Sequence, residues 1–209
     1  MHGAWQLAPL VGAVVLVLAT SGCTGDDGTA TAPVPTTSAS VTPSRAPSPT
    51  PTVVPTATAP ALADGSDPDV GMFFTALPDV TGDEARAAET LMRFEVEFWR
   101  SMTTGAVSSA LDDVASADVV QIVRNQVEGN KDRKITTSGS ASDAFVDVNS
   151  GTKTVVIDVC NTMDDAVFTK GTKKTTGPEA GFDPAIVRME VGETPKGWRV
   201  QSYTVRDAC

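Results

Sequence analysis

Histidine is almost absent from this chain of 209 residues, whose single histidine is His2. If the N-terminal segment is removed, the mature chain has none, which excludes Ser-His-Asp and Cys-His catalysis and histidine-ligated metal sites. Positive charge is also scarce, because 16 Lys and Arg stand against 26 Asp and Glu, a net charge of −10. Nucleic-acid binding needs a cationic face, so we expect no nucleic-acid partner. P-loop, GxGxxG, GxSxG and HExxH patterns are missing as well, and we expect no cofactor and no metal.

The N-terminus carries about ten apolar residues at positions 10–19, which is the length of a signal-peptide core and too short for a membrane-spanning helix. Thr20, Ser21 and Gly22 then precede Cys23. This order resembles a bacterial lipobox, although Thr20 stands where that family usually has Leu. In a lipobox the cysteine is lipidated and, after cleavage, becomes the first residue of the mature protein. The resemblance implies a signal peptide at 1–22 and a lipid anchor on the extracytoplasmic face of the cell membrane. The alternative is an uncleaved anchor helix, which also places the chain outside the cytoplasm.

Three cysteines are present, and their number suggests how they are used. With Cys23 assigned to lipid, Cys160 and Cys209 remain as an even pair. In an oxidising compartment such a pair is expected to form a disulfide, and two reduced thiols are the alternative.

Residues 23–66 have the composition of a spacer rather than of a folded domain. Eight of the fourteen prolines fall within residues 31–60, where Arg45 is the only charged residue and aromatic residues are absent. Nothing there can nucleate a core, and the prolines favour extended polyproline II. We therefore expect a disordered linker, which would reach roughly 130 Å when fully extended. Glycosylated stalks have a similar composition.

The remaining residues, 67–209, show helical periodicity first and strand periodicity afterwards, which indicates an α+β domain. Thr81 and Glu84 have the spacing of a capping box, and Gly105 is expected to end the helix that they begin. Further helices are expected over 107–114 and from about 116 to about 130. Beyond residue 134 we expect strands at 135–148, 152–160, 166–175, 185–193 and 198–206, with hairpin turns at 149–151 and 195–197.

One long amphipathic helix, shorter helices and a meander of long strands resemble the NTF2-like (SnoaL-like) α+β cone. Residues 197–205, GWRVQSYTV, are similar to the last strand of that superfamily, and the lipobox, the spacer, Cys160 and Cys209 add a resemblance to actinobacterial cell-envelope lipoproteins. The resemblance implies N-terminal helices packed on a curved antiparallel sheet around a conical cavity, and a cystatin-like sheet gives much the same pattern. Members include isomerase-like enzymes, polyketide cyclases, binding modules and dimerisation domains, so the fold alone does not assign a function.

Glu95 is the most informative polar residue, because it lies in the middle of the apolar face of the first helix. An unpaired buried carboxylate is costly, so Glu95 needs a partner or a hydrated cavity. It is either a pocket carboxylate with a raised pKa, available as a general base, or a structural residue. The structural alternatives, which we favour, are an ion pair with Arg188 or Arg199 and a side chain that reaches solvent at the rim of the cone.

The other candidate pocket residues lie on the same helix and on two strands: Phe98, Trp99, Asp158 and Tyr203. Phe98 and Trp99 also fit the hydrophobic core, with Phe94, Phe145 and Trp198. Asp158 shares a strand face with Cys160, and we expect that face to be the outer one. Tyr203, the only tyrosine, fits a half-buried packing position. Lys170, Lys173 and Lys174 fit a solvated hairpin tip, and a weak contact with anionic wall polymers is the alternative.

Three hypotheses about function follow. We favour a non-enzymatic lipoprotein whose domain binds a small ligand or an envelope protein. The second is an isomerase, dehydratase or cyclase that uses a cavity carboxylate such as Glu95, and the third is a structural dimerisation module. A closed apolar cavity with convergent polar groups would favour an enzyme. An exposed apolar patch on the open sheet face would favour a partner-binding module. A cone filled by aromatic side chains would weaken every pocket hypothesis.

Overall fold

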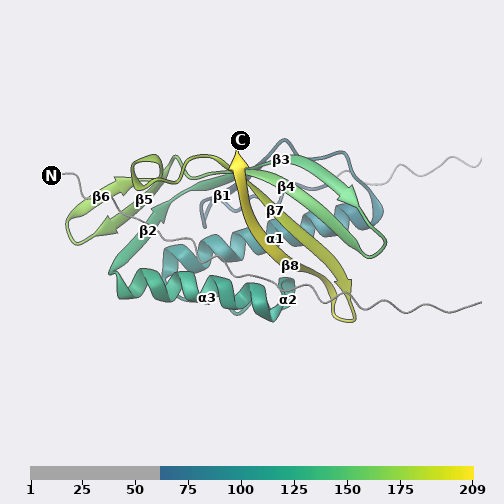
Figure 1. The fold of residues 1–209 in the computed structure, drawn as a ribbon, viewed down its shortest axis with the longest axis horizontal. Coiled ribbons are helices and arrows are strands. Elements are labelled where there is room, and N and C mark those ends of the chain that lie inside the picture. The colour runs from purple at the N-terminus through teal and green to yellow at the C-terminus, as the bar shows by residue number, and fades with distance from the viewer. Residues whose placement is uncertain (1–61) are drawn as a thin grey trace, which may run out of the picture. The chain divides into compact units, whose positions relative to one another are not determined.

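The structure, a computed structural model, describes residues 62–209, so the expected signal peptide, Cys23 and most of the expected linker lie outside the described residues. The described part is an α+β domain (Figure 1). Its elements in chain order are β1 (Met72–Thr75), α1 (Gly82–Thr104), α2 (Leu111–Val114), α3 (Ala117–Asp132), β2 (Ile135–Gly139), β3 (Ala141–Ser150), β4 (Thr154–Thr162), β5 (Ala166–Lys170), β6 (Lys173–Thr176), the 3-10 turn η1 (Pro178–Ala180), β7 (Ala185–Thr194) and β8 (Gly197–Ala208). The expected fold class is confirmed.

Two sheets are present in this part of the chain. The larger has the strand order β1-β3-β4-β7-β8 and is antiparallel except for the parallel pair β1 and β3. The smaller has the order β2-β5-β6 and is antiparallel. The helices α1, α2 and α3 lie on one face of the larger sheet (Figure 1). Both expected hairpins, β3 with β4 and β7 with β8, are confirmed.

The core lies between α1 and the covered face of the larger sheet. Strand alternation turns Val155, Ile157 and Val159 of β4 toward the helices, and each is at most 1% exposed. Leu91 and Trp99 on α1 are buried to the same extent. Burying each large apolar side chain contributes roughly 1.5–3 kcal/mol, so this layer supplies most of the driving force that holds α1 on the sheet.

One expected strand, residues 135–148, is two strands in different sheets, and the break falls at Gly139 and Ser140. Gly139 has a φ of 84°, and a Cβ atom there would lie 2.1 Å from the carbonyl oxygen of Asp165. Only glycine allows this close approach, which turns the chain from β2 into β3. The indole nitrogen of Trp99 also donates a hydrogen bond to the Gly139 carbonyl, 3.4 Å away. The period-two pattern continues through the break and therefore hides it.

The stretch 166–175 was likewise expected as one strand and is the hairpin β5–β6, which turns at Gly171 with a φ of 61°. β1 was not expected at all. It is only four residues long, and its pairing with β3 is parallel and remote in sequence.

The helix boundaries agree with expectation for α1, whose N-cap is Thr81 and whose C-cap is Gly105 in the left-handed region. The capping box itself is not formed, because Thr81 makes no side-chain cap hydrogen bond and Glu84 accepts one from Ser150 instead, at 2.7 Å. Ser116 does cap α3, since its hydroxyl accepts the backbone N–H of Val119.

The helix expected at 107–114 is reduced to the four residues of α2. Ser108 takes part in competing hydrogen bonds: its backbone N–H donates to the Ser101 hydroxyl and its own hydroxyl donates to Glu97. Such bonds compete with helical hydrogen bonding. Conversely, α3 ends at Asp132, slightly beyond the expected end at about residue 130. No helix among residues 62–209 is long and apolar enough to cross a membrane.

Candidate functional site

The candidate site is built around Glu95, which is 3% exposed and faces the sheet from the middle of α1. Neither expected cation pairs with it. Arg188 binds Asp158, and Arg199 donates to the backbone carbonyls of Asp112 and Ala115. The expected ion pair is therefore wrong, and so is the expected exposure at a rim, because packing encloses the carboxyl group.

Asp143 on β3 is the neighbour of Glu95, and the sequence analysis missed it. Its side chain is fully buried, and its Oδ1 accepts a hydrogen bond of 2.7 Å from the side-chain amide of Asn161. Asp143 and Asn161 lie directly opposite each other in the β3–β4 register, which explains the bond. The second oxygen, Oδ2, is buried without a hydrogen-bond partner. The missed signal was the strand alternation that puts Asp143 on the same face as buried Phe145.

Burial makes both carboxyl groups weak acids. It raises the pKa of Glu95 well above its ordinary value of 4.5, and the charge of Asp143 raises it further. Burial also raises the pKa of Asp143, from 3.8 to about 7, although the hydrogen bond from Asn161 acts in the opposite direction. Two carboxylates in one desolvated site repel each other, so the pair retains a proton near neutral pH.

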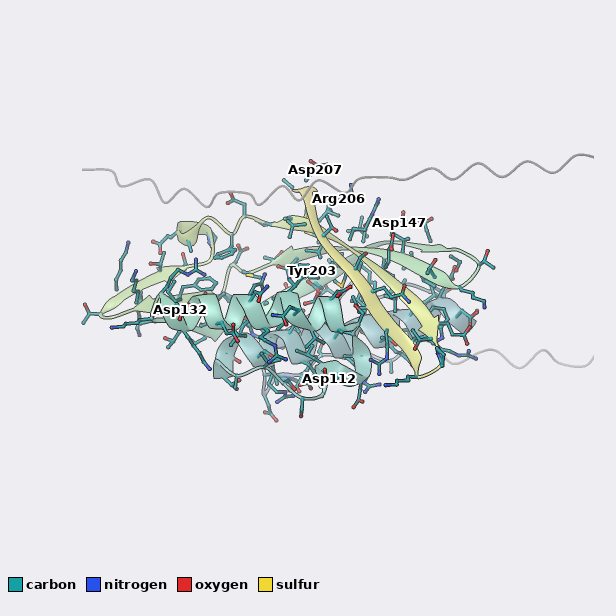
Figure 2. The ribbon with its side chains drawn as sticks, turned by 60° about the horizontal axis from the view of Figure 1, so that its bottom comes forward. Asp112, Asp132, Asp147, Tyr203, Arg206 and Asp207 are labelled. Carbon is teal, nitrogen blue, oxygen red and sulfur yellow. A yellow bond between two sulfur atoms is a disulfide. The ribbon has the colours of Figure 1, made fainter. Side chains whose placement is uncertain are left out.

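Tyr203 completes the cluster from β8. Its ring centroid lies 6.2 Å from that of Phe94 and 6.0 Å from that of Phe98, and the two phenylalanine rings are 6.1 Å apart. Burial raises the pKa of Tyr203 well above its ordinary value of 10, and the charges of Glu95 and Asp143 raise it further. Figure 2 shows Tyr203 between β8 and the helices. The phenol is therefore neutral beside the carboxyl pair.

The aromatic residues next to Glu95 on α1 are buried. Phe98 is 6% exposed, and Phe94 and Trp99 are 1% exposed. Two surface cavities lie elsewhere. One of about 420 Å³ is lined by residues 64–68 with Arg93, Val96 and Glu97, and one of about 310 Å³ lies where α1 and α3 end. Neither is lined by Glu95, Asp143 or Tyr203.

Asp158 does not belong to this cluster, so its assignment to a pocket with Glu95 is corrected. It lies on the opposite face of β4 from Ile157, directly across from Arg188. Arg188 donates two hydrogen bonds to it, from Nε at 2.7 Å and from a terminal nitrogen at 2.6 Å. These bonds hold the pKa of Asp158 below its ordinary value. Asp158 therefore lies on the outer face of the sheet, as the strand pattern predicted.

The disulfide between Cys160 and Cys209 is confirmed, with an S–S distance of 2.08 Å and Cα atoms 5.8 Å apart. It ties the end of β8 to β4 across β7. Cys23 stays a prediction, because it lies outside the described residues. Within residues 62–209 no group of three or more His, Cys, Asp or Glu side chains is placed to hold a metal ion.

Comparisons with known proteins do not assign the chain to a family, because no family model and no curated protein matches it. Among solved structures, the intermembrane-space region of the chloroplast protein ARC6 aligns over 62% of this chain and 100% of its own, with 9% identity and a TM-score of 0.47. A de novo designed β-sheet protein aligns over 58% of this chain and 88% of its own, with 14% identity and a TM-score of 0.33. Both similarities are too distant to support an argument about function.

Proposed function

We propose that the chain is a lipid-anchored extracytoplasmic protein whose NTF2-like domain binds an envelope partner rather than catalysing a reaction. The lipobox-like residues before Cys23 support the anchor. The disulfide supports an oxidising compartment, since such bonds are rare in the cytosol. A diacylglycerol on Cys23 carries two acyl chains, which is enough for stable membrane attachment.

Metabolic labelling with a radioactive or clickable fatty acid tests the anchor. We expect label on the full-length protein and none on a Cys23→Ala variant, because the thiol is the only acceptor that the lipobox supplies. A Cys209→Ala variant is the matched control and should keep the label. Label that persists after Cys23→Ala would contradict the anchor.

The open face of the larger sheet is the observation that carries the proposed binding function. The described helices cover only the other face (Figure 1). On the open face, Val146 is 57% exposed where β3 bulges between Phe145 and Asp147, and Val156 and Ile186 are half-buried. Apolar side chains that border charged groups on an uncovered sheet are typical of protein-binding surfaces.

Charged residues surround these apolar side chains on the same face. The Asp158–Arg188 ion pair crosses β4 and β7, and Figure 2 shows Asp147 and Arg206 on the side of the sheet away from the helices. The Arg188 guanidinium interacts electrostatically with the carboxylates of Asp158, Asp147 and Glu190. Positive and negative charges around a small apolar centre orient a protein partner more than they increase its affinity.

Site-specific photo-crosslinking in intact cells tests this face. A photoreactive amino acid at Val146 is expected to give a discrete adduct with an envelope protein, whereas the same amino acid at Gln126, exposed on α3, is expected to give none. An adduct of twice the chain's mass would identify a second copy and support the dimerisation module instead. Equal labelling at both positions, or none at Val146, would contradict a binding role for this face.

A proton-transfer enzyme is the second candidate, because the Glu95–Asp143 pair and Tyr203 provide proton-holding groups in an apolar setting. A substrate would have to pass Phe94 and Phe98, whose packed rings make this candidate weaker. A native mass spectrum that shows a co-purified small molecule bound to the domain would favour it over partner binding.

A further inference from the structure

Lysine is concentrated at one end of the domain. The chain has seven lysines, and five of them lie where α3 ends and where β5 turns into β6. Arg133 joins them, which gives a basic end of six exposed cations: Lys131, Arg133, Lys134, Lys170, Lys173 and Lys174.

The fold brings these two segments together although they are more than 30 residues apart in sequence. β2 begins at Ile135, just after the last turn of α3, and Ile135 lies directly opposite Lys170 of β5. Lys170 in turn lies opposite Lys173 of β6. Figure 1 shows the β5–β6 turn and the end of α3 at the same end of the domain, and Figure 2 labels Asp132 there.

The charge of this end opposes the charge of the whole chain, which is −10. Carboxylates accompany the six cations as well, among them those of Glu128, Asp132 and Glu179, and Asp183 follows Phe182 in the chain. The terminal carbonyls of α3 are partly occupied, because the backbone N–H and side chain of Arg133 donate to Gly129 and the N–H of Lys134 donates to Lys131. The lysine residues of this end are exposed.

Apolar side chains lie beside the lysines. Phe168 and Phe182 stack with centroids 4.8 Å apart, and Phe182 is 40% exposed. The cavity of about 310 Å³ has Met102, Val127 and Ile135 among its lining residues, and Lys131 and Lys134 also border it. Lysines next to aromatic and aliphatic groups suit the boundary between phosphate headgroups and acyl chains.

We propose that this basic end docks the domain on an anionic phospholipid surface. Charge complementarity supplies the attraction, because each lysine near an anionic membrane strengthens binding about fivefold. The chain between Cys23 and Leu62 is long enough to allow it, since 38 residues span about 120 Å at most and do not force the domain away from the membrane. The proposal rests on the anchor at Cys23 for its biological setting, whereas vesicle binding itself needs no lipid on the protein.

Vesicle sedimentation tests the docking surface. The chain from Thr24 to Cys209 keeps every described residue and the disulfide, and it is mixed with phosphatidylcholine vesicles that contain or lack phosphatidylglycerol. We expect binding only to the anionic vesicles, and we expect high salt to abolish it. Lys173→Gln together with Lys174→Gln is expected to weaken binding roughly 25-fold.

The matched control is Lys153→Gln together with Lys196→Gln, which removes the same charge from the β3–β4 and β7–β8 turns. It should bind like the parent, and equal urea midpoints for all three proteins establish that each is folded. Equal losses in both double variants, or equal binding to neutral vesicles, would overturn the proposal. A soluble glycerol-phosphate polymer that binds this end while anionic vesicles do not would also overturn it, in favour of a wall polymer. None of these failures affects fatty-acid labelling at Cys23 or crosslinking at Val146.

Discussion

Raising the pH from about 5 to about 8 is expected to lower the free energy of unfolding of this domain. Glu95 and Asp143 have pKa values in the folded state above those of an unfolded chain. A carboxyl group whose pKa is raised on folding stabilises the folded state at pH values below its unfolded pKa, near 4. This stabilisation is lost as the pH rises through the pKa of the folded state. For Asp143 the shift from 3.8 to about 7 corresponds to about 4 kcal/mol, and that contribution is lost between about pH 4 and about pH 7.

Asp143→Asn tests this expectation, because an amide of the same shape carries no titrating proton. Urea unfolding across the pH range should show a flatter stability profile for the variant. Near pH 8 the variant should be more stable than the parent, by up to about 4 kcal/mol. The amide oxygen can still accept the hydrogen bond that Asn161 gives to Asp143.

Asp147→Asn is the matched control, since Asp147 is an exposed carboxylate on the same strand. It should leave the slope of the parent unchanged between about pH 5 and about pH 8. Glu95→Gln combined with Asp143→Asn should flatten the profile further. If Asp143→Asn kept the slope of the parent, the carboxyl pair would not hold its proton in the folded protein.

Loss of the disulfide has a comparable expected effect. Cys160 and Cys209 are 49 residues apart, so the bond closes a long loop in the unfolded chain, and its removal is expected to destabilise the domain by about 4 kcal/mol. Replacing both cysteines by serine should lower the urea midpoint accordingly. The end of β8 is exposed and depends on this bond for attachment to β4, so its amides should lose hydrogen-exchange protection first.

Treatment with a reductant separates the effect of losing the disulfide bond from the effect of replacing cysteine by serine. Reduction of the parent should lower its midpoint to that of the double serine variant, whose own midpoint should not respond. A double variant as stable as the oxidised parent would mean that native packing, rather than the crosslink, holds β8 in place.

Local patterns were enough to predict much of the fold. The 3–4 spacing of Leu91, Glu95 and Phe98 places these residues on one helical face, and the αL glycine at 105 ends α1 where expected. Turn residues between alternating strands predicted both hairpins of the larger sheet. The errors came where a local pattern was ambiguous: Gly139 interrupts a strand only because Asp165 approaches it closely.

The candidate site was predicted only in part. Glu95 could be recognised because helical periodicity alone puts a carboxyl group among apolar residues. Its partner could not be named, because Asp143 comes from a strand 48 positions later and two arginines were equally plausible on sequence grounds. The pattern of β4 also placed Asp158 on the outer face, but its bidentate partner depends on the β4–β7 register.

By itself the sequence determined the α+β class, most of the helix and strand types and the pairing of Cys160 with Cys209, because these depend on local periodicity, turn chemistry and a count of residues. Tertiary structure alone decided that Glu95 meets Asp143 and Tyr203, and that α3 and the β5–β6 turn share one basic end. The physical reason is the same in both cases. A pKa shift or a charged surface depends on distances between segments remote in sequence, and packing and strand register set those distances.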